Sequence, residues 1–309
     1  MVGCENHRAP PPDQTKRTPR QHHHTNLTAP GSRTRALSLV TLVPMVALAL
    51  AGCAGSPSLT GDDHPEQPLT HVHGIVDDPA TDGFLIGTHE GIFTVTRDGE
   101  LGARLAKTDF DAMGLTVLDD TLVASGHPGR TTPPELGAPN LGIIRSSDNG
   151  QSWQPTAFTG EKDFHALAAD PRGTLYGVAT DANEMLTSTD GGVSWQPTGA
   201  PVYAMSLAVD AAGRVMASTA DGLLVSTDRA ATFQAWPDAP LLAGLSASPD
   251  HNRVVGIGTQ GRIWATTAGA QNWFEVGTIH GTAQAVTITN NGDILVVDDS
   301  GLSLIPYQQ

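Results

Sequence analysis

Four residues with metal-binding side chains occupy one position of a repeated pattern in this sequence. His73, Met113, His165 and Met205 each stand directly before a small residue that opens a short apolar stretch. Imidazole nitrogen and thioether sulfur are borderline-soft to soft ligands, and a His/Met set without thiolate suits copper best. Zinc is the alternative where carboxylates join the set. The residue types therefore point to binding of a transition metal.

Other polar residues fall near the same position. His71, Asp111 and Asp163 stand two residues earlier, and His89 and His127 lie in connections that we expect to reach the same face. His280 belongs to this face as well, whereas His251 does not. The candidate ligand or metal residues are thus His71, His73, His89, His127, His165, Met113, Met205, Asp111 and Asp163.

The plainer interpretation of these residues is structural. Methionines can fill an apolar wall, and histidines can hydrogen-bond one element to the next. The sequence contains no phosphate-binding glycine loop, no G-x-S-x-G turn and no H-E-x-x-H pair, so it identifies no catalytic residue. Ligand binding is therefore the prediction, and catalysis stays open.

A phrase repeated four times indicates which elements position these residues. It spans 146–153, 188–195, 226–233 and, in eroded form, 266–273, and its closing aromatics lie 42, 38 and 40 residues apart. A steady period near forty is typical of propellers and other repeat folds. Between the phrases, apolar residues alternate with period two and no stretch sustains helical spacing.

The phrase S-x-D-x-G-x-[ST]-W resembles the Asp-box, or BNR, repeat of β-propellers, which occurs in sialidases, sortilin-type receptors and photosystem assembly factors. In such a hairpin the aspartate accepts hydrogen bonds from turn amides, the glycine supplies a positive φ, and the aromatic packs between sheets. We therefore assign a structural role to Asp148, Trp153, Asp190, Trp195, Asp228 and Phe233.

These repeats predict an all-β fold, a β-propeller of six blades of about forty residues over 69–309, with seven blades as the alternative. The six units begin near residues 71, 111, 163, 203, 241 and 282. The innermost strands should line a central channel, so that His73, Met113, His165 and Met205 face one another across its mouth. The last unit ends without a fourth strand, and we expect residues before His71 to close the ring.

The region before the repeats has the features of an export signal. Arg33 and Arg35 are basic, 36–50 form an apolar run, and small residues follow, which is typical of a signal peptide rather than a membrane span. The phrase L-A-G-C ending at Cys53 resembles the bacterial lipobox, whose cysteine is acylated. We expect a signal region at 1–52, whose start is unusually long, and a lipidated Cys53 with a flexible tether at 53–68.

Charge and cysteine content limit the partners. Residues 1–52 hold six of the 17 Lys and Arg and two of the 32 Asp and Glu, which leaves a formal charge of -19 on the rest. Such a surface repels nucleic acid and anionic lipid, so the membrane contact should come from the lipid anchor. Cys4 and Cys53 are the only cysteines, so a lipidated Cys53 leaves the mature protein without a thiol for a disulfide or a thiolate metal site. We expect a monomer, exported to the outer face of the bacterial membrane, with an envelope protein or a glycan as ligand.

The phrases H-V-H-G, T-H-E-G, S-G-H-P and D-F-H-A, which contain five of the candidate histidines, together resemble a group of exported bacterial propellers loosely labelled glycosyl hydrolases. The resemblance implies an exo-α-sialidase-type hydrolase as one alternative function and a non-catalytic interaction scaffold as another. A sialidase mechanism would need three arginines that grip a carboxylate. Only Arg130, Arg145 and Arg262 are candidates, with Tyr203 and Glu184 as a nucleophile and its partner.

Overall fold

Twenty-three β-strands and two short 3-10 turns make up the described part of the protein. The computed structural model describes residues 71–182 and 184–306. The signal region, Cys53, the tether and the expected closing strand lie outside the described residues. No helix of the described residues is long and apolar enough to cross a membrane.

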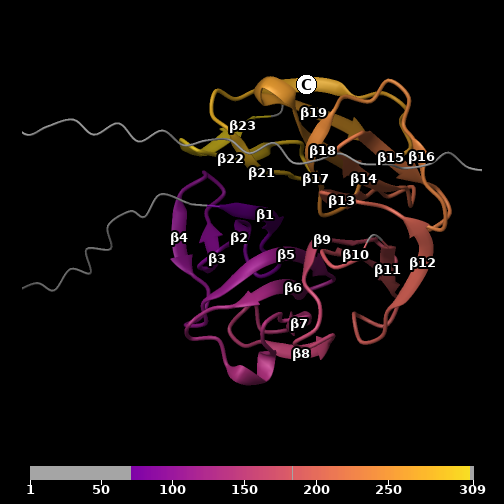
Figure 1. Cartoon of the computed structure of the whole chain (residues 1–309). Helices are drawn as coiled ribbons and strands as arrows, with labels where there is room; N and C mark the ends of the chain where they lie inside the picture. Colours follow the sequence, from indigo (N-terminus) through magenta and orange to yellow (C-terminus); the bar gives the residue numbers. More distant parts are fainter. Residues whose placement is uncertain (1–70, 183, 307–309) are drawn as a thin grey trace, which may run out of the picture. The chain divides into compact units, whose positions relative to one another are not determined.

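The strands form six antiparallel sheets, each built from consecutive strands (Figure 1). The first sheet contains β1 (Val72–Asp77), β2 (Phe84–Thr88), β3 (Gly91–Val95) and β4 (Leu101–Arg104). The second contains β5 (Phe110–Leu118), β6 (Thr121–Pro128), β7 (Ile143–Ser146) and β8 (Gln154–Ala157), with the turn η1 (Pro134–Leu136) between β6 and β7. The third contains β9 (Phe164–Ala169), β10 (Leu175–Ala179), β11 (Glu184–Ser188) and β12 (Gln196–Pro201).

The second half of the chain repeats this arrangement. The fourth sheet contains β13 (Ser206–Val209), β14 (Val215–Thr219), β15 (Gly222–Ser226) and β16 (Gln234–Ala235). The fifth contains β17 (Leu242–Ala247), β18 (Arg253–Gly258), β19 (Arg262–Thr267) and β20 (Phe274–Thr278), with the turn η2 (Thr259–Gly261) before β19. The sixth has three described strands, β21 (Ala283–Ile288), β22 (Ile294–Asp298) and β23 (Gly301–Ile305).

The first strand of each sheet touches the first strand of the next, and the series closes on itself. β1 contacts β5, β5 contacts β9, β9 contacts β13, β13 contacts β17, β17 contacts β21, and β21 contacts β1. The backbone amide of Val72 also donates to Gln284 Oε1 at 2.8 Å, which links the first blade to the last. The predicted all-β, six-bladed propeller is therefore confirmed.

Six apolar clusters fill the spaces between neighbouring blades. Each cluster combines residues of two adjacent sheets; the cluster between blades one and six, for example, joins Val72 and Phe84 to Leu295 and Val297. Burial of these side chains on both faces of a sheet is what stacks the blades radially. The ring is thus held by apolar contacts at every blade boundary, including the boundary between first and last.

The repeated phrase folds into the same turn three times. In the first copy Ser146 Oγ donates to Asp148 Oδ1 at 2.7 Å and accepts from the Gly150 amide at 2.7 Å, while the Ser152 amide donates to Asp148 Oδ1 at 2.9 Å. Asp190 and Asp228 are held by the corresponding groups of their own turns. These hydrogen bonds, first those from the turn hydroxyls, lower the pKa of all three aspartates to about 2.

The aromatic that closes each phrase packs against the preceding blade. Trp153 packs on the cluster between blades one and two, and Trp195 belongs to the cluster between blades two and three. Within their own blades, the ring centroids of Trp153 and Phe110 lie 5.3 Å apart and those of Trp195 and Phe164 lie 5.4 Å apart. Phe233 packs on the cluster between blades three and four, and Trp273 belongs to the cluster between blades four and five. The phrase therefore fixes a turn within one blade and an apolar contact to the preceding one.

A β-bulge interrupts five of the six innermost strands at equivalent places. In β1 the pairing passes from Val72 opposite Thr88 to Gly74 opposite Gly87, so His73 is the extra residue. Strands β5, β9, β17 and β21 show the same irregularity. The extra residues of these bulges are His73, Met113, His165, Ala243 and Gln284. A bulge re-aims one side chain out of the regular alternation.

Candidate functional site

The bulge residues line the central channel of the ring. This channel has a volume of about 770 Å³ and its wall includes His73, Met113, His165, Met205 and Gln284. The flanking residues Val72, Ala112, Phe164 and Leu242 are buried in the cores between blades. At these bulges, the residue before the extra residue packs in the apolar core between blades, and the extra residue faces the channel.

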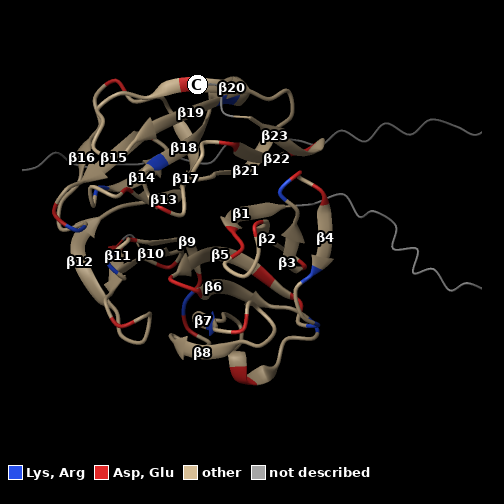
Figure 2. Ribbon diagram, turned by 180° about the vertical axis from the view of Figure 1, so that it is seen from behind, with Lys and Arg blue, Asp and Glu red and all other residues tan. Residues whose placement is uncertain are grey.

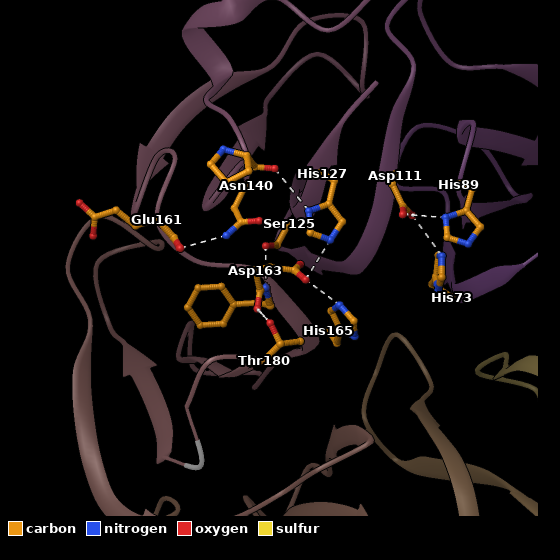
Figure 3. A network of polar contacts seen from close by, with 12 residues as sticks. His73, His89, Asp111, Ser125, His127, Asn140, Glu161, Asp163, His165 and Thr180 are labelled. Atoms are coloured by element: carbon orange, nitrogen blue, oxygen red, sulfur yellow. Dashed lines mark hydrogen bonds and ion pairs between the residues drawn. The ribbon is translucent and has the colours of Figure 1, made fainter. Parts of the chain in front are cut away.

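The first group of polar side chains joins blades one and two. Asp111, at the start of β5, places Oδ1 3.1 Å from His73 Nε2 and Oδ2 2.6 Å from His89 Nδ1 (Figure 3). His89 lies between β2 and β3, and its ring stands edge-on to those of His73 and His71, with centroids 4.7 and 4.9 Å apart. One carboxylate thus lies between two imidazoles, with a third imidazole beside them.

The second group joins blades two and three. Asp163, directly before β9, places Oδ2 2.6 Å from His165 Nε2 and 3.3 Å from His127 Nε2 (Figure 3). His127 lies near the end of β6, and its Nδ1 lies 3.4 Å from the carbonyl oxygen of Pro139. Since a carbonyl oxygen can only accept, Nδ1 is the donor in this contact, and Nε2 is the nitrogen that faces Asp163.

The two groups are neighbours through a single pair of residues in blade two. Asp111 of the first group stands opposite His127 of the second in the register of β5 and β6. Gly126 precedes His127 with a φ of 145°, and a Cβ at this position would lie 1.8 Å from the Asp111 carbonyl oxygen. Glycine is therefore needed where the two groups meet.

Burial differs among the ligand atoms. Asp163 has only 5% of its side chain exposed and Asp111 has 18%, whereas His89, His127 and His165 are each about 41–42% exposed. Burial by itself would raise the pKa of Asp111, but the contacts of its carboxylate with His73 and His89 lower that pKa below its usual value. The carboxylates of Asp111 and Asp163 thus lie beneath a partly exposed layer of imidazoles.

Three buried polar atoms in these groups have no hydrogen-bond partner among the described residues. They are His73 Nε2, Asp111 Oδ1 and Asp163 Oδ1. His73 Nε2 and Asp111 Oδ1 are close but not aligned as donor and acceptor, so their 3.1 Å contact counts as an electrostatic one only. Buried polar atoms usually have a hydrogen-bond partner, so these three are free to contact a water molecule or an ion.

The sequence-predicted residues are distributed as follows. His73, His89 and Asp111 lie within 4.8 Å of one another by one ligand atom each, and so do His127, Asp163 and His165. Instead of the expected single His/Met set across the channel, the histidines and aspartates form two separate His₂Asp groups. Met113 and Met205 line the channel, and His280 is exposed and belongs to neither group.

The residues considered for a sialidase mechanism do not gather at this channel. Arg130, Arg145 and Arg262 are absent from its wall. Arg262 lies 3.8 Å from Glu275 on neighbouring outer strands, and Glu184 stands opposite Pro201 in the third blade. Tyr203 is 72% exposed at the entry to β13. The mouth therefore offers carboxylate and imidazole groups rather than a cluster of guanidinium groups.

Comparisons with known proteins agree on the fold. No family model matches the chain, and none of the curated proteins matches it. Among solved structures, the GH74 enzyme of Niastella koreensis is 19% identical with a TM-score of 0.52, over 78% of this chain and 38% of that one. The extracellular domain of BT4673 from B. thetaiotaomicron is 14% identical with a TM-score of 0.51, over 77% and 32%.

A chain of the nidogen/laminin complex gives a TM-score of 0.53 at 12% identity, over 70% of this chain and 85% of that one. By contrast, the chain spans only about a third of the GH74 and BT4673 structures, at 38% and 32% of their lengths. Identities this low establish architecture alone. By fold and by comparison, then, the protein is a six-bladed β-propeller, and its function has to be argued from its own residues.

Proposed function

We propose that the channel mouth binds divalent transition-metal ions at two centres, one formed by His73, His89 and Asp111 and the other by His127, Asp163 and His165. The observation that carries this proposal is that one ligand atom from each member of a group lies within 4.8 Å of the others. Two imidazole nitrogens and a carboxylate oxygen are a common protein set for such ions.

The donor atoms favour a borderline ion. Each group offers nitrogen and oxygen, and the thioethers of Met113 and Met205 belong to neither. Nitrogen and carboxylate donors suit zinc(II) and copper(II), whereas copper(I) prefers sulfur. Three protein ligands leave a fourth position for water or another ligand. In the first centre, rotation of the adjacent His71 ring would supply that fourth donor.

The surroundings of the ligands support this proposal. A metal-binding histidine usually donates its second ring N–H to a carbonyl or carboxylate, which fixes the ring orientation. His127 has this arrangement, with Nδ1 directed at the Pro139 carbonyl and Nε2 at Asp163. A bound cation would also satisfy Asp163 Oδ1, Asp111 Oδ1 and His73 Nε2, which are buried without hydrogen bonds in the described structure.

Metal analysis of the full chain tests the proposal. Because His22, His23 and His24 form a run that can bind metal by itself, all three are replaced by Gln in the background protein, which carries no affinity tag. We expect two equivalents of zinc(II) or copper(II) per chain after dialysis. Asp111→Asn and Asp163→Asn should each leave one equivalent, and the double variant none.

His251→Ala is the matched control, because this histidine lies at the other end of the channel and its Nδ1 contacts the Val209 carbonyl. It should retain both equivalents. If the background protein binds no metal, or if the double variant still binds two ions, the proposal fails. The two groups are then hydrogen-bonded contacts between blades and nothing more.

The protein's location is a separate proposal that rests on the sequence. We propose that the propeller is an exported lipoprotein held at the bacterial membrane through Cys53. Within the described residues, Asp and Glu occur on loops of every blade while Lys and Arg are few, and Figure 2 shows this excess of acidic residues. Such a surface would keep the propeller itself off an anionic bilayer. A hydrolase or scaffold activity remains the alternative function.

A further inference from the structure

A second pocket lies on the opposite face of the propeller, between blades two and three. Its volume is about 410 Å³, and its wall contains Thr121, Arg145, Ser147, Ser152, Gln154, Pro155, Thr156 and Val193. Strand β7 runs away from the channel mouth that carries the histidines, so its end and the hairpin that follows lie at the other face. This pocket is therefore separate from both candidate metal centres.

Arg145 is the charged group of this pocket, and it has no acidic partner. No ion pair joins it to a carboxylate among the described residues, and no Asp or Glu lines the pocket. Its Nε is buried and has no hydrogen-bond partner in the same part of the chain. Arg145 is thus a half-buried guanidinium without a counter-ion in an acidic protein. Because burial of an unpaired charge is unfavourable, this guanidinium is suited to bind an anion from solution.

The neighbouring blade holds the guanidinium in place. A Cβ on Gly191 would lie only 2.9 Å from Arg145 Nη1, so the arginine packs directly on the backbone of this turn. The nearby aspartate of the turn, Asp190, is occupied by Ser188, Val193 and Ser194. Asp148 is likewise held by Ser146 and Ser152. Both carboxylates are therefore committed to their hairpins.

The rest of the wall is mainly polar and uncommitted. The side chains of Thr121, Ser147 and Gln154 make no hydrogen bond within the described residues, and Ser152 Oγ, which donates to Asp148, can still accept one. Pro155 and Val193, the latter 58% exposed, add a small apolar surface. The pocket thus combines one guanidinium group that can bind an anion, several hydroxyl and amide groups, and a small apolar patch.

From these groups we propose that the pocket binds a sugar acid, meaning a monosaccharide-sized ligand that carries a carboxylate and several hydroxyls. The guanidinium would take the carboxylate through two parallel hydrogen bonds. Thr121, Ser147 and Gln154 would bind the hydroxyls, and Pro155 with Val193 would contact the C–H face of the ring. The ligand is either a free sugar acid or one residue of an acidic polysaccharide.

Calorimetry on the full chain in the presence of EDTA tests this proposal without any contribution from metal. The probes are glucuronate, glucose, acetate and sulfate, with an alginate oligomer as a fifth. We expect glucuronate to bind, and glucose and acetate to bind at least tenfold more weakly. Glucose lacks the carboxylate that Arg145 would bind, and acetate lacks the hydroxyls. Binding of the oligomer alone would identify the polysaccharide as the source.

Arg145→Gln should weaken glucuronate binding about tenfold or more and leave the melting temperature unchanged. Arg145→Lys should retain part of the affinity, because lysine keeps the positive charge but cannot form the two parallel hydrogen bonds of a guanidinium. Arg262→Gln is the matched control, since Arg262 lies on the third strand of blade five and is close to Glu275. The Asp111→Asn, Asp163→Asn double variant should bind glucuronate as the parent does.

The proposal is overturned if none of the sugar-acid probes binds the parent protein, or if Arg145→Gln binds glucuronate as tightly as the parent. Sulfate binding equal to that of glucuronate, lost in Arg145→Gln, would also overturn it, because the pocket would then be a simple anion site. None of these results depends on whether the two His₂Asp groups bind metal.

Discussion

Replacement of Gly126 by alanine should damage the fold and both candidate centres together. Gly126 lies on β6 opposite Ala112, beside the bulge at Met113, and has a φ of 145°. An added Cβ would lie 1.8 Å from the Asp111 carbonyl oxygen and 3.0 Å from the Met113 amide nitrogen. The contact atoms are backbone, so no side-chain rotation can relieve the overlap.

The expected cost has two parts. An alanine at this φ costs about 1–3 kcal/mol in backbone strain. The overlap with Asp111 then forces β5 and β6 apart by about 1 Å or more and disrupts one or two ladder hydrogen bonds, at about 1 kcal/mol each. We therefore expect Gly126→Ala to lower the free energy of unfolding by about 2–5 kcal/mol in total.

Gly173→Ala is the control for strain alone. Gly173 also has a positive φ, of 90°, but nothing lies within 4 Å of its added Cβ. Gly173→Ala should cost only the strain part, about 1–3 kcal/mol. Urea denaturation measures both values, and metal analysis of the folded protein reports the two centres, because Asp111 and His127 flank the glycine.

The reasoning is refuted if Gly126→Ala and Gly173→Ala lower the free energy of unfolding equally. It is also refuted if folded Gly126→Ala binds both metal ions as the parent does, because Asp111 and His127 then need no close approach of the two strands at this point.

Three further predictions concern the repeats, the channel and the anchor. Ser188→Ala should lower the free energy of unfolding, measured by urea denaturation, by about 1–3 kcal/mol, because Ser188 Oγ accepts from the buried Gly192 amide at 2.8 Å. The same loss is expected for Ser146→Ala and Ser226→Ala. An unchanged free energy of unfolding in all three variants would contradict a structural role for the turn. Burial raises the pKa of Asp77 to about 6 although Arg97 lies 3.4 Å away, so its contribution to stability is full below about pH 4 and is lost as the pH rises through 6. The stability of Asp77→Asn relative to the parent should therefore rise between pH 4 and 7. The upper limit of this gain is about 3 kcal/mol, and partial exposure of the carboxyl makes the gain smaller. A difference in melting temperature that does not change with pH would count against this prediction. Cys53→Ser should abolish lipid labelling and release the protein from the membrane fraction, whereas parent protein found wholly unlipidated in the medium would end the anchoring proposal.

The architecture followed from the sequence because it depends on local patterns that repeat. The spacing of Trp153, Trp195, Phe233 and Trp273 gave the period, and period-two alternation gave the strands. Each repeat cannot bury its own apolar faces, so neighbours must stack, and the apolar clusters at all six blade boundaries follow from that. Alignment of the inner strands also placed His73, Met113, His165 and Met205 at one position, and all four line the channel.

The grouping of the ligands could not be read from that alignment. Asp163 contacts the histidine of its own strand, His165, whereas Asp111 contacts His73 on the inner strand of the preceding blade. Both aspartates occupy the same position of the repeat, so the pattern treats them alike. The sequence alone therefore predicted one His/Met set, and only the packing of one blade against the next divided the histidines into two groups.

The physical reason lies in the bulges and in the angle between blades. A bulge adds one residue to β1, β5 and β9 and turns its side chain out of the strict alternation. The sequence determined which residues reach the mouth of the channel, because strand order and period fix that. Which imidazole meets which carboxylate was decided by tertiary structure, since contacts of about 3 Å between blades depend on bulge geometry and apolar packing that no local pattern encodes.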